Sequence, residues 1–153
     1  MEALLKKLNF KSPARACILH LPEGLDGLLA AIPPATPVDT TPQAGQVYDF
    51  ALAFCEQASD IARHFPSLAP QLAPDAVYYI AYPKKSSKRY QSDINRDADC
   101  WQVLGGAGYE GVRQVAIDED WSALRFRHVD FIKSMQRSSA RAMSQEGKKR
   151  TKR

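Results

Sequence analysis

Short apolar runs alternate with amphipathic segments along this chain, and the alternation predicts most of its structure. Residues 14–21, 47–54 and 76–82 are apolar and are bounded by turn residues, as strands buried on both faces are. Residues 25–32 and 56–72, which lie between them, carry apolar side chains at helical spacing. Such an alternation favours parallel strands joined by right-handed crossovers.

Prolines modify this pattern in two places. Pro66 predicts either a kink in the helix at 56–72 or two shorter helices, because proline lacks the amide hydrogen that a helix interior needs. Residues 33–46 contain four prolines, so Val38 and its neighbours can form only a short strand at or near a sheet edge. Ala-Pro-Asp at residues 73–75 predicts a turn before the third long strand.

The two ends of the folded region have shorter elements. A helix carrying the leucines of residues 4–8 opens the chain and ends at Ser12-Pro13. Residues 111–117 and 123–129 are expected to be strands, and the short connection between them predicts an antiparallel pair.

One further helix is expected between the third long strand and this pair. Ser92 or Asp93 would cap its amino end, and a run of glycines after residue 104 would end it. Its apolar face would consist of Ile94, Ala98, Trp101 and Leu104.

These elements together predict one three-layer α/β domain with a Rossmann-like fold. The expected sheet is mostly parallel and has about six strands in the order 2-1-3-4-6-5, with only the last strand antiparallel. The domain would span residues 1–132. Residues 133–153 turn to Arg, Lys, Ser, Gln and Gly, a composition that predicts a disordered tail.

Charge separates these two parts. Residues 133–153 hold eight Lys/Arg and one acid (+7), whereas residues 1–132 hold 13 Lys/Arg and 16 Asp/Glu (−3), which together give the net +4. The tail would attract polyanions through a salt-sensitive electrostatic term, so nucleic acid or an acidic protein is its candidate partner; the alternative is a solubilising terminus. The basic residues concerned are Lys148, Lys149, Arg150, Lys152 and Arg153.

Composition narrows the class of protein further. No stretch approaches the roughly 18 apolar residues of a membrane span, and the first ten residues lack the apolar core of a signal peptide, so we expect a cytoplasmic protein without a membrane partner. Cys17, Cys55 and Cys100 are odd in number and far apart in sequence, which argues against a disulfide framework or a metal site.

The parallel topology predicts where a ligand would bind. Ligands of open α/β sheets bind outside the carboxyl ends of the strands, and four loops would share that edge: residues 20–24, 54–57, 83–90 and 118–122. The candidate ligand-binding residues in these loops are His20, Glu23, Lys84, Lys85, Ser86, Ser87, Asp118, Trp121 and Ser122, with Glu56 and Asp120 beside them.

Each candidate also has a simpler interpretation. The loop at residues 84–87 offers two ammonium groups and two hydroxyls for a phosphate or carboxylate, but it can equally be a solvated loop whose lysines pair with Asp118 and Asp120. Trp121 can stack on a ligand or belong to the core. The acids of residues 118–120 can be exposed turn residues, and His20 has no partner carboxylate visible in the sequence.

The sequence therefore favours a non-enzymatic or cryptic binding domain for a small anionic ligand. It identifies no catalytic residue, no metal ligand and no particular cofactor. Cys55 stands at a strand end, as a nucleophile would, but no motif surrounds it, and neither His64 nor His128 belongs to a recognisable constellation.

Two stretches resemble the paired signatures of an uncharacterised bacterial family, domain of unknown function 3052. These are YYIAYPKKSS at residues 78–87 and AIDEDWSALRF at residues 116–126, where a strand ends in Pro-Lys and a later strand begins with Trp-Ser and an arginine. The resemblance extends over residues 4–130 and implies an α/β fold in a bacterial cytoplasm, with no assigned activity. Ala123 stands where that family usually has glycine.

The chain is also similar, more distantly, to the latter half of S-adenosylmethionine-dependent methyltransferases. Those enzymes also end with a strand, a helix and an antiparallel pair. They need a glycine-rich turn after the first strand, whereas this chain has Pro22 there, with only Gly24 and Gly27 nearby. Residues 54–57, Phe-Cys-Glu-Gln, also differ from the Asp/Asn-Pro-Pro-Tyr motif of amino-methylating enzymes. A divergent methyltransferase-like enzyme is therefore an alternative to the binding domain.

Overall fold

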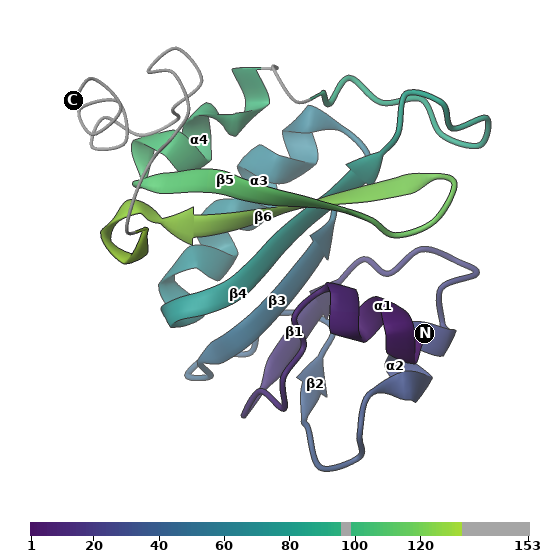
Figure 1. Cartoon of the computed structure of the whole chain (residues 1–153). Coiled ribbons are helices and arrows are strands. Elements are labelled where there is room, and N and C mark those ends of the chain that lie inside the picture. Colours follow the sequence, from purple (N-terminus) through teal and green to yellow (C-terminus); the bar gives the residue numbers. More distant parts are fainter. Residues whose placement is uncertain (96–98, 133–153) are drawn as a thin grey trace.

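A computed structural model describes residues 1–95 and 99–132, which form one α/β unit around a six-stranded sheet (Figure 1). The strands are β1 (Ala16–Leu19), β2 (Val38–Asp39), β3 (Tyr48–Phe54), β4 (Leu72–Pro83), β5 (Tyr109–Ala116) and β6 (Trp121–His128). The helices are α1 (Glu2–Lys7), α2 (Gly27–Ala31), α3 (Ala58–Leu68) and α4 (Gln102–Gly106), with short 3-10 helices η1 (Ala69–Gln71), η2 (Asp99–Trp101) and η3 (Val129–Phe131).

The sheet confirms the predicted topology. Its strand order is β2-β1-β3-β4-β6-β5. β1 pairs in parallel with β2 and β3, and β3 pairs in parallel with β4. β6 lies between β4 and β5 and runs antiparallel to both, so it is the one reversed strand of the sheet within the described residues. The fold is therefore mostly parallel and Rossmann-like.

Helices cover both faces of the sheet and produce two apolar cores. One core joins buried side chains of α1 and α2, such as Leu5 and Leu28, to the strand residues Phe50 and Tyr79. The other joins Ile61 and Phe65 of α3, together with α4 residues, to the opposite side of β3, β4 and β6. This is the three-layer arrangement that an alternating βα sequence produces.

The predicted turn at residues 73–75 is wrong, because these residues lie inside β4. Tyr48 pairs with Leu72, whereas Phe50 pairs with Val77, so β4 bulges outward between these two pairs. Pro74 cannot donate to the ladder, and Asp75 has a positive φ of 52°, which bends the strand without ending it. The bulge directs the Asp75 carboxylate to Arg127 of β6, which donates to it from Nε and Nη2 at 2.9 and 2.7 Å.

The helix predicted after Ser92 is also shorter than expected. Helical structure begins at Asp99, while residues 96–98 lie outside the described part of the chain. Asp93 does not cap this helix; its Oδ1 accepts a hydrogen bond from the backbone N–H of Ala58 at 2.7 Å, at the start of α3. Asp93 thus stabilises the amino end of a different helix.

Two smaller boundaries differ from the sequence pattern. α3 continues through Pro66 to Leu68, since a proline in the last turn removes only one hydrogen bond. β6 begins at Trp121, two residues before the predicted strand, and Ala123 lies within it, opposite Ala81 of β4. Ala123 therefore occupies a strand position and not a turn.

Gly108 lies at a crowded position between α4 and β5. A Cβ atom at Gly108, whose φ is +88°, would lie 2.6 Å from Nε2 of His128, whereas a Cβ at Gly24, whose φ is +93°, would meet nothing within 4 Å.

We expect Gly24→Ala to cost about 1 kcal/mol of unfolding free energy, from backbone strain alone, and Gly108→Ala to cost about 2–3 kcal/mol. Urea unfolding of both variants checks this; equal losses would contradict the described contact with His128.

Candidate functional site

The carboxyl ends of the parallel strands meet at one edge of the sheet, and the β5–β6 turn lies at the same edge. β5 is parallel to β4 because both pair antiparallel with β6, and Pro83 at the end of β4 pairs with Trp121 at the start of β6. The backbone N–H of Lys84 donates to the carbonyl of Asp120 at 2.8 Å, which joins the loop after β4 to this turn. The structure thus brings all four predicted loops to one edge.

A pocket of about 270 Å³ opens at this edge, above the ends of β1 and β3. Aromatic side chains form part of its wall, and histidine, acidic and arginine side chains form the rest. Its lining residues are His20, Pro22, Phe54, Glu56, Asp60, Arg63, His64, Tyr90 and Trp121.

The aromatic part of the pocket is continuous with the core. Trp121 is 4% exposed, and its ring packs edge-on against Phe54, with ring centroids 5.3 Å apart. The ring of Tyr90, in the loop after β4, lies 5.0 Å from Trp121 on the pocket side. Trp121 is therefore both a core residue and part of the pocket wall, so its place in the core is compatible with stacking on a ligand.

A pair of imidazoles also lines the pocket. The rings of His20 and His64 have centroids 4.4 Å apart and are tilted by 35°. His20 directly follows β1 with a positive φ of 56°, which turns the exposed ring toward α3. Burial lowers the pKa of His64, and the neighbouring His20 and Arg63 lower it further, because a second positive charge is unfavourable there.

Asp60 organises the amino end of α3 beside these rings. Its carboxylate accepts hydrogen bonds from the backbone N–H groups of Glu56 and Gln57, at 3.2 and 3.0 Å, and forms an ion pair with Arg63. An acid in the first turn satisfies amide groups that have no partner within the helix. Asp60 is thus occupied, while the exposed Glu56 carboxylate stands at the pocket rim.

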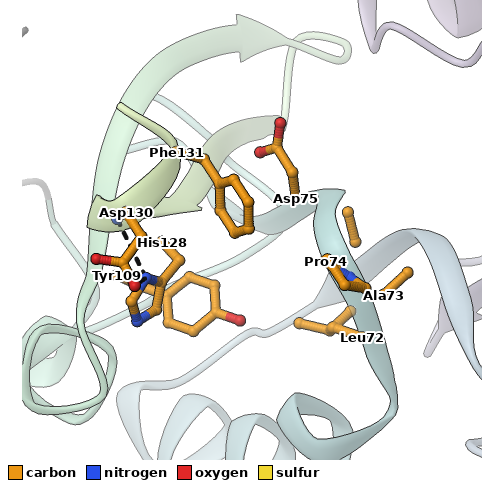
Figure 2. A pocket seen from close by; sticks show the side chains of 9 residues that line it. Leu72, Ala73, Pro74, Asp75, Tyr109, His128, Asp130 and Phe131 are labelled. Carbon is orange, nitrogen blue, oxygen red and sulfur yellow. Dashed lines mark hydrogen bonds and ion pairs between the residues drawn. The ribbon is translucent and has the colours of Figure 1, made fainter. Parts of the chain in front are cut away.

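A second pocket, of about 300 Å³, lies at the opposite edge of the sheet, beside the β4 bulge (Figure 2). The hydroxyl of Tyr109 points across it toward Leu72 and Pro74, and the ring of Phe131 stands above. His128 lines this pocket together with Asp130, whose carboxylate is 3.4 Å from His128 Nδ1. The sequence pattern does not reveal this site, because it depends on the bulge and on η3.

Known structures share this fold. Phosphoethanolamine N-methyltransferase 2 of Haemonchus contortus, which was solved with phosphomonomethylethanolamine and S-adenosylhomocysteine, matches with 11% identity and a TM-score of 0.52. The match covers 86% of this chain and 39% of that enzyme. TrmN of Thermus thermophilus matches with 12% identity and a TM-score of 0.54, over 82% of this chain and 46% of its own. The chain has a Rossmann-like fold, which it shares with these structures. It spans less than half the length of these structures.

Sequence comparisons give no further relatives. No family model and no curated protein matches the chain. The resemblance to the family of unknown function therefore remains a prediction from the residues quoted above, and the fold rests on the structures.

Several predicted ligand residues have structural partners instead. Ser87 Oγ donates to Asp120 Oδ1 at 2.8 Å and accepts from the backbone of Arg89 and Tyr90, so it shapes the loop. Asp118 Oδ1 accepts from the backbone N–H groups of Asp120 and Trp121, both at 2.8 Å, and so holds the β5–β6 turn.

The remaining candidates are divided between places. His20 and Trp121 line the pocket, whereas Ser122 is buried and accepts from Gln114 Nε2 at 2.8 Å on the α4 side of the sheet. Glu23, Lys85 and Ser86 are exposed, and Lys84 is half-buried; none of the four lines the pocket. The polyanion-binding residues proposed in the tail lie outside the described residues.

Asp60, Arg63 and His64, which α3 contributes to the pocket, were not predicted as site residues. His64, for which the sequence shows no constellation, packs against His20. A helix that follows a parallel strand begins at the carboxyl edge, so residues of its first two turns were candidates by position.

The buried thiols have no reactive character. Burial raises the pKa of Cys55, at the end of β3, to about 12, and that of Cys17 likewise to about 12, so both remain protonated near neutral pH.

Within residues 1–95 and 99–132, no three His, Cys, Asp or Glu side chains are grouped so that they could hold a metal ion. No helix in this part of the chain has the length and apolar character to cross a membrane.

The lowered pKa of His64 predicts a pH effect with a definite sign. The unfolded chain binds a proton to His64 near pH 6.5, whereas the folded protein does so only at lower pH, so stability falls as the pH drops below about 6.5. NMR titration of the His64 ring should give a pKa below that of an ordinary histidine, and His20→Ala should raise it. An unchanged His64 pKa in His20→Ala would show that the two rings do not interact.

Proposed function

We propose that this protein binds a compact ligand that joins a planar ring to an anionic group, at the carboxyl edge of its sheet. The observation that supports this is the juxtaposition of an aromatic pocket with a basic loop. Ligand sites of Rossmann-like sheets lie at this edge. Small-molecule sites also combine aromatic side chains with polar groups that fix the orientation of the ligand.

The ring would lie in the pocket between the aromatic wall and the imidazoles. Trp121 and Tyr90 offer ring faces, and the ring nitrogens of His20 and His64 can form hydrogen bonds with the ligand. The volume of about 270 Å³ is near the lower end for ligand pockets, roughly 300 Å³. A single ring system therefore fits better than an extended cofactor.

The anionic group would face the loop that follows β4. This loop carries Lys84, Lys85, Lys88 and Arg89 directly before Tyr90, which lines the pocket. Arg89 also lies over the Tyr90 ring, 5.6 Å from its centroid. Because Asp120 is bonded to Ser87 and no ion pair between these lysines and Asp118 or Asp120 occurs in the described residues, the ammonium groups can serve an external anion.

An S-adenosyl compound is the second candidate, because the Haemonchus methyltransferase shares the fold. The Haemonchus enzyme was solved with S-adenosylhomocysteine. Pro22, however, lines the pocket of this chain after β1, and Gly24 lies beyond the lining, so the close backbone approach of a glycine-rich turn is missing at this point. We therefore favour a binding domain over an active methyltransferase.

Adenosine monophosphate, adenosine and S-adenosylhomocysteine are suitable probes, measured by thermal unfolding of the full chain. We expect the monophosphate to stabilise the protein, by about 2.7 kcal/mol when its concentration is 100 times Kd. Lys84→Glu/Lys85→Glu should remove this stabilisation, because it reverses the charge that meets the phosphate, while the smaller effect of adenosine should remain.

Lys6→Glu/Lys11→Glu is the matched control, since it changes the net charge equally at exposed positions outside the loop. It should respond to the monophosphate as the unmodified protein does. An undiminished response of Lys84→Glu/Lys85→Glu would disprove the anion site. Stabilisation by S-adenosylhomocysteine alone would favour the methyltransferase-like alternative.

A further inference from the structure

A row of three polar side chains crosses the face of the sheet that α1 and α2 cover. Tyr79 of β4 pairs with Arg125 of β6, and Arg125 pairs with Arg113 of β5, so all three side chains project from the same face. The same row begins with Ile18 and Leu52, which are buried. The apolar core of this face thus ends in two adjacent arginines.

Two polar atoms in this row are buried without a partner among the described residues. The hydroxyl of Tyr79 and the Nε of Arg125 are both inaccessible to water, and neither forms a hydrogen bond within residues 1–95 and 99–132. The Tyr79 side chain as a whole is 0% exposed, with its ring 6.3 Å from that of Phe50. A buried donor without a partner is unfavourable and rare in folded proteins, and a bound anion would satisfy it.

Neither arginine of the row forms an ion pair within the described residues. Arginines directly opposite each other on antiparallel strands repel. Asp75 forms its two hydrogen bonds with Arg127, two residues further along β6. Burial lowers the pKa of Arg125; Arg127 and Arg113 lower it further, while Asp75 acts in the opposite direction.

We propose that Tyr79, Arg113 and Arg125 form a phosphate site on this face of the sheet, separate from the pocket at the carboxyl edge. The two guanidinium groups are donors only, and the Tyr79 hydroxyl can donate as well. A tetrahedral phosphate has enough oxygens to accept from all three, whereas a planar carboxylate has two, and arginine binds phosphate in a bidentate manner.

The exposure of the three residues indicates how the phosphate enters. Arg113 is exposed, Arg125 is half-buried, and the Tyr79 hydroxyl lies at the buried end of the row. The side chain of Arg113 is long and flexible, so it can move aside and then close over the anion. The phosphate would neutralise the repulsion between the arginines and accept the hydrogen bond from Tyr79.

Tyr79→Phe tests the proposal because it removes the hydroxyl alone and keeps the packing of the ring. In a chloride buffer without phosphate, we expect this variant to be as stable as the unmodified protein or more stable, since the lost donor had no partner. With inorganic phosphate at equal ionic strength, the variant should bind about tenfold more weakly. Lower stability of Tyr79→Phe in chloride would show that the hydroxyl has a partner in the free protein, and would overturn the proposal.

NMR signals of the arginine Nε–H groups locate the site within the full chain. Phosphate and sulfate should shift the Nε–H signals of Arg113 and Arg125, acetate should shift them less, and Arg113→Gln should abolish the response of Arg125. Arg63→Gln removes the same charge from the carboxyl-edge pocket and should leave the response of Arg125 to phosphate unchanged. The proposal is wrong if phosphate leaves the Arg125 signal unmoved, or if Arg63→Gln abolishes its shift.

Discussion

The insertion of β6 between β4 and β5 determines where every candidate site of this protein lies. Because β6 is antiparallel to both neighbours, its first residue is at the carboxyl edge and its last at the amino edge. Trp121 therefore reaches the pocket above β1 and β3, while His128 reaches the pocket beside the β4 bulge. The middle of the same strand places Arg125 between Tyr79 and Arg113.

One strand can serve three places because successive side chains project from opposite faces. Trp121, Ala123 and Arg125 belong to the face that α1 and α2 cover, whereas Leu124 and Phe126 pack under α3 and α4. The alternation seen in the sequence was therefore informative, but it did not show how far the helices extend. The core on the first face includes Ala123 and stops before Arg125, so the transition from apolar to charged occurs within β6.

The strand order was predictable because three apolar runs, two crossover helices and one tight connection leave few alternatives. The register was not predictable from the same pattern. Pro74 and Asp75 predict a turn by their local preferences, yet pairing of Leu72 with Tyr48 keeps them inside a strand. The ion pair between Asp75 and Arg127 joins residues far apart in sequence and compensates for the bend. The tertiary contact therefore overrides the local preference of these residues for a turn.

For the candidate site too, the topology was predictable from the sequence, whereas the side-chain contacts were not. The edge was predictable, and so was the presence of His20 and Trp121 there, because both follow directly from strand ends. The roles of Ser87 and Asp118 were not, because hydroxyl and carboxylate groups in tight turns are as suited to backbone amides as to a ligand. Once these groups are occupied in holding the loops, the aromatic wall, the two imidazoles and the exposed Glu56 carboxylate remain at the pocket, and the lysines of the loop after β4 lie outside its lining. In the proposed complex, the ring of the ligand therefore depends on the pocket wall, and its anionic group depends on the neighbouring loop.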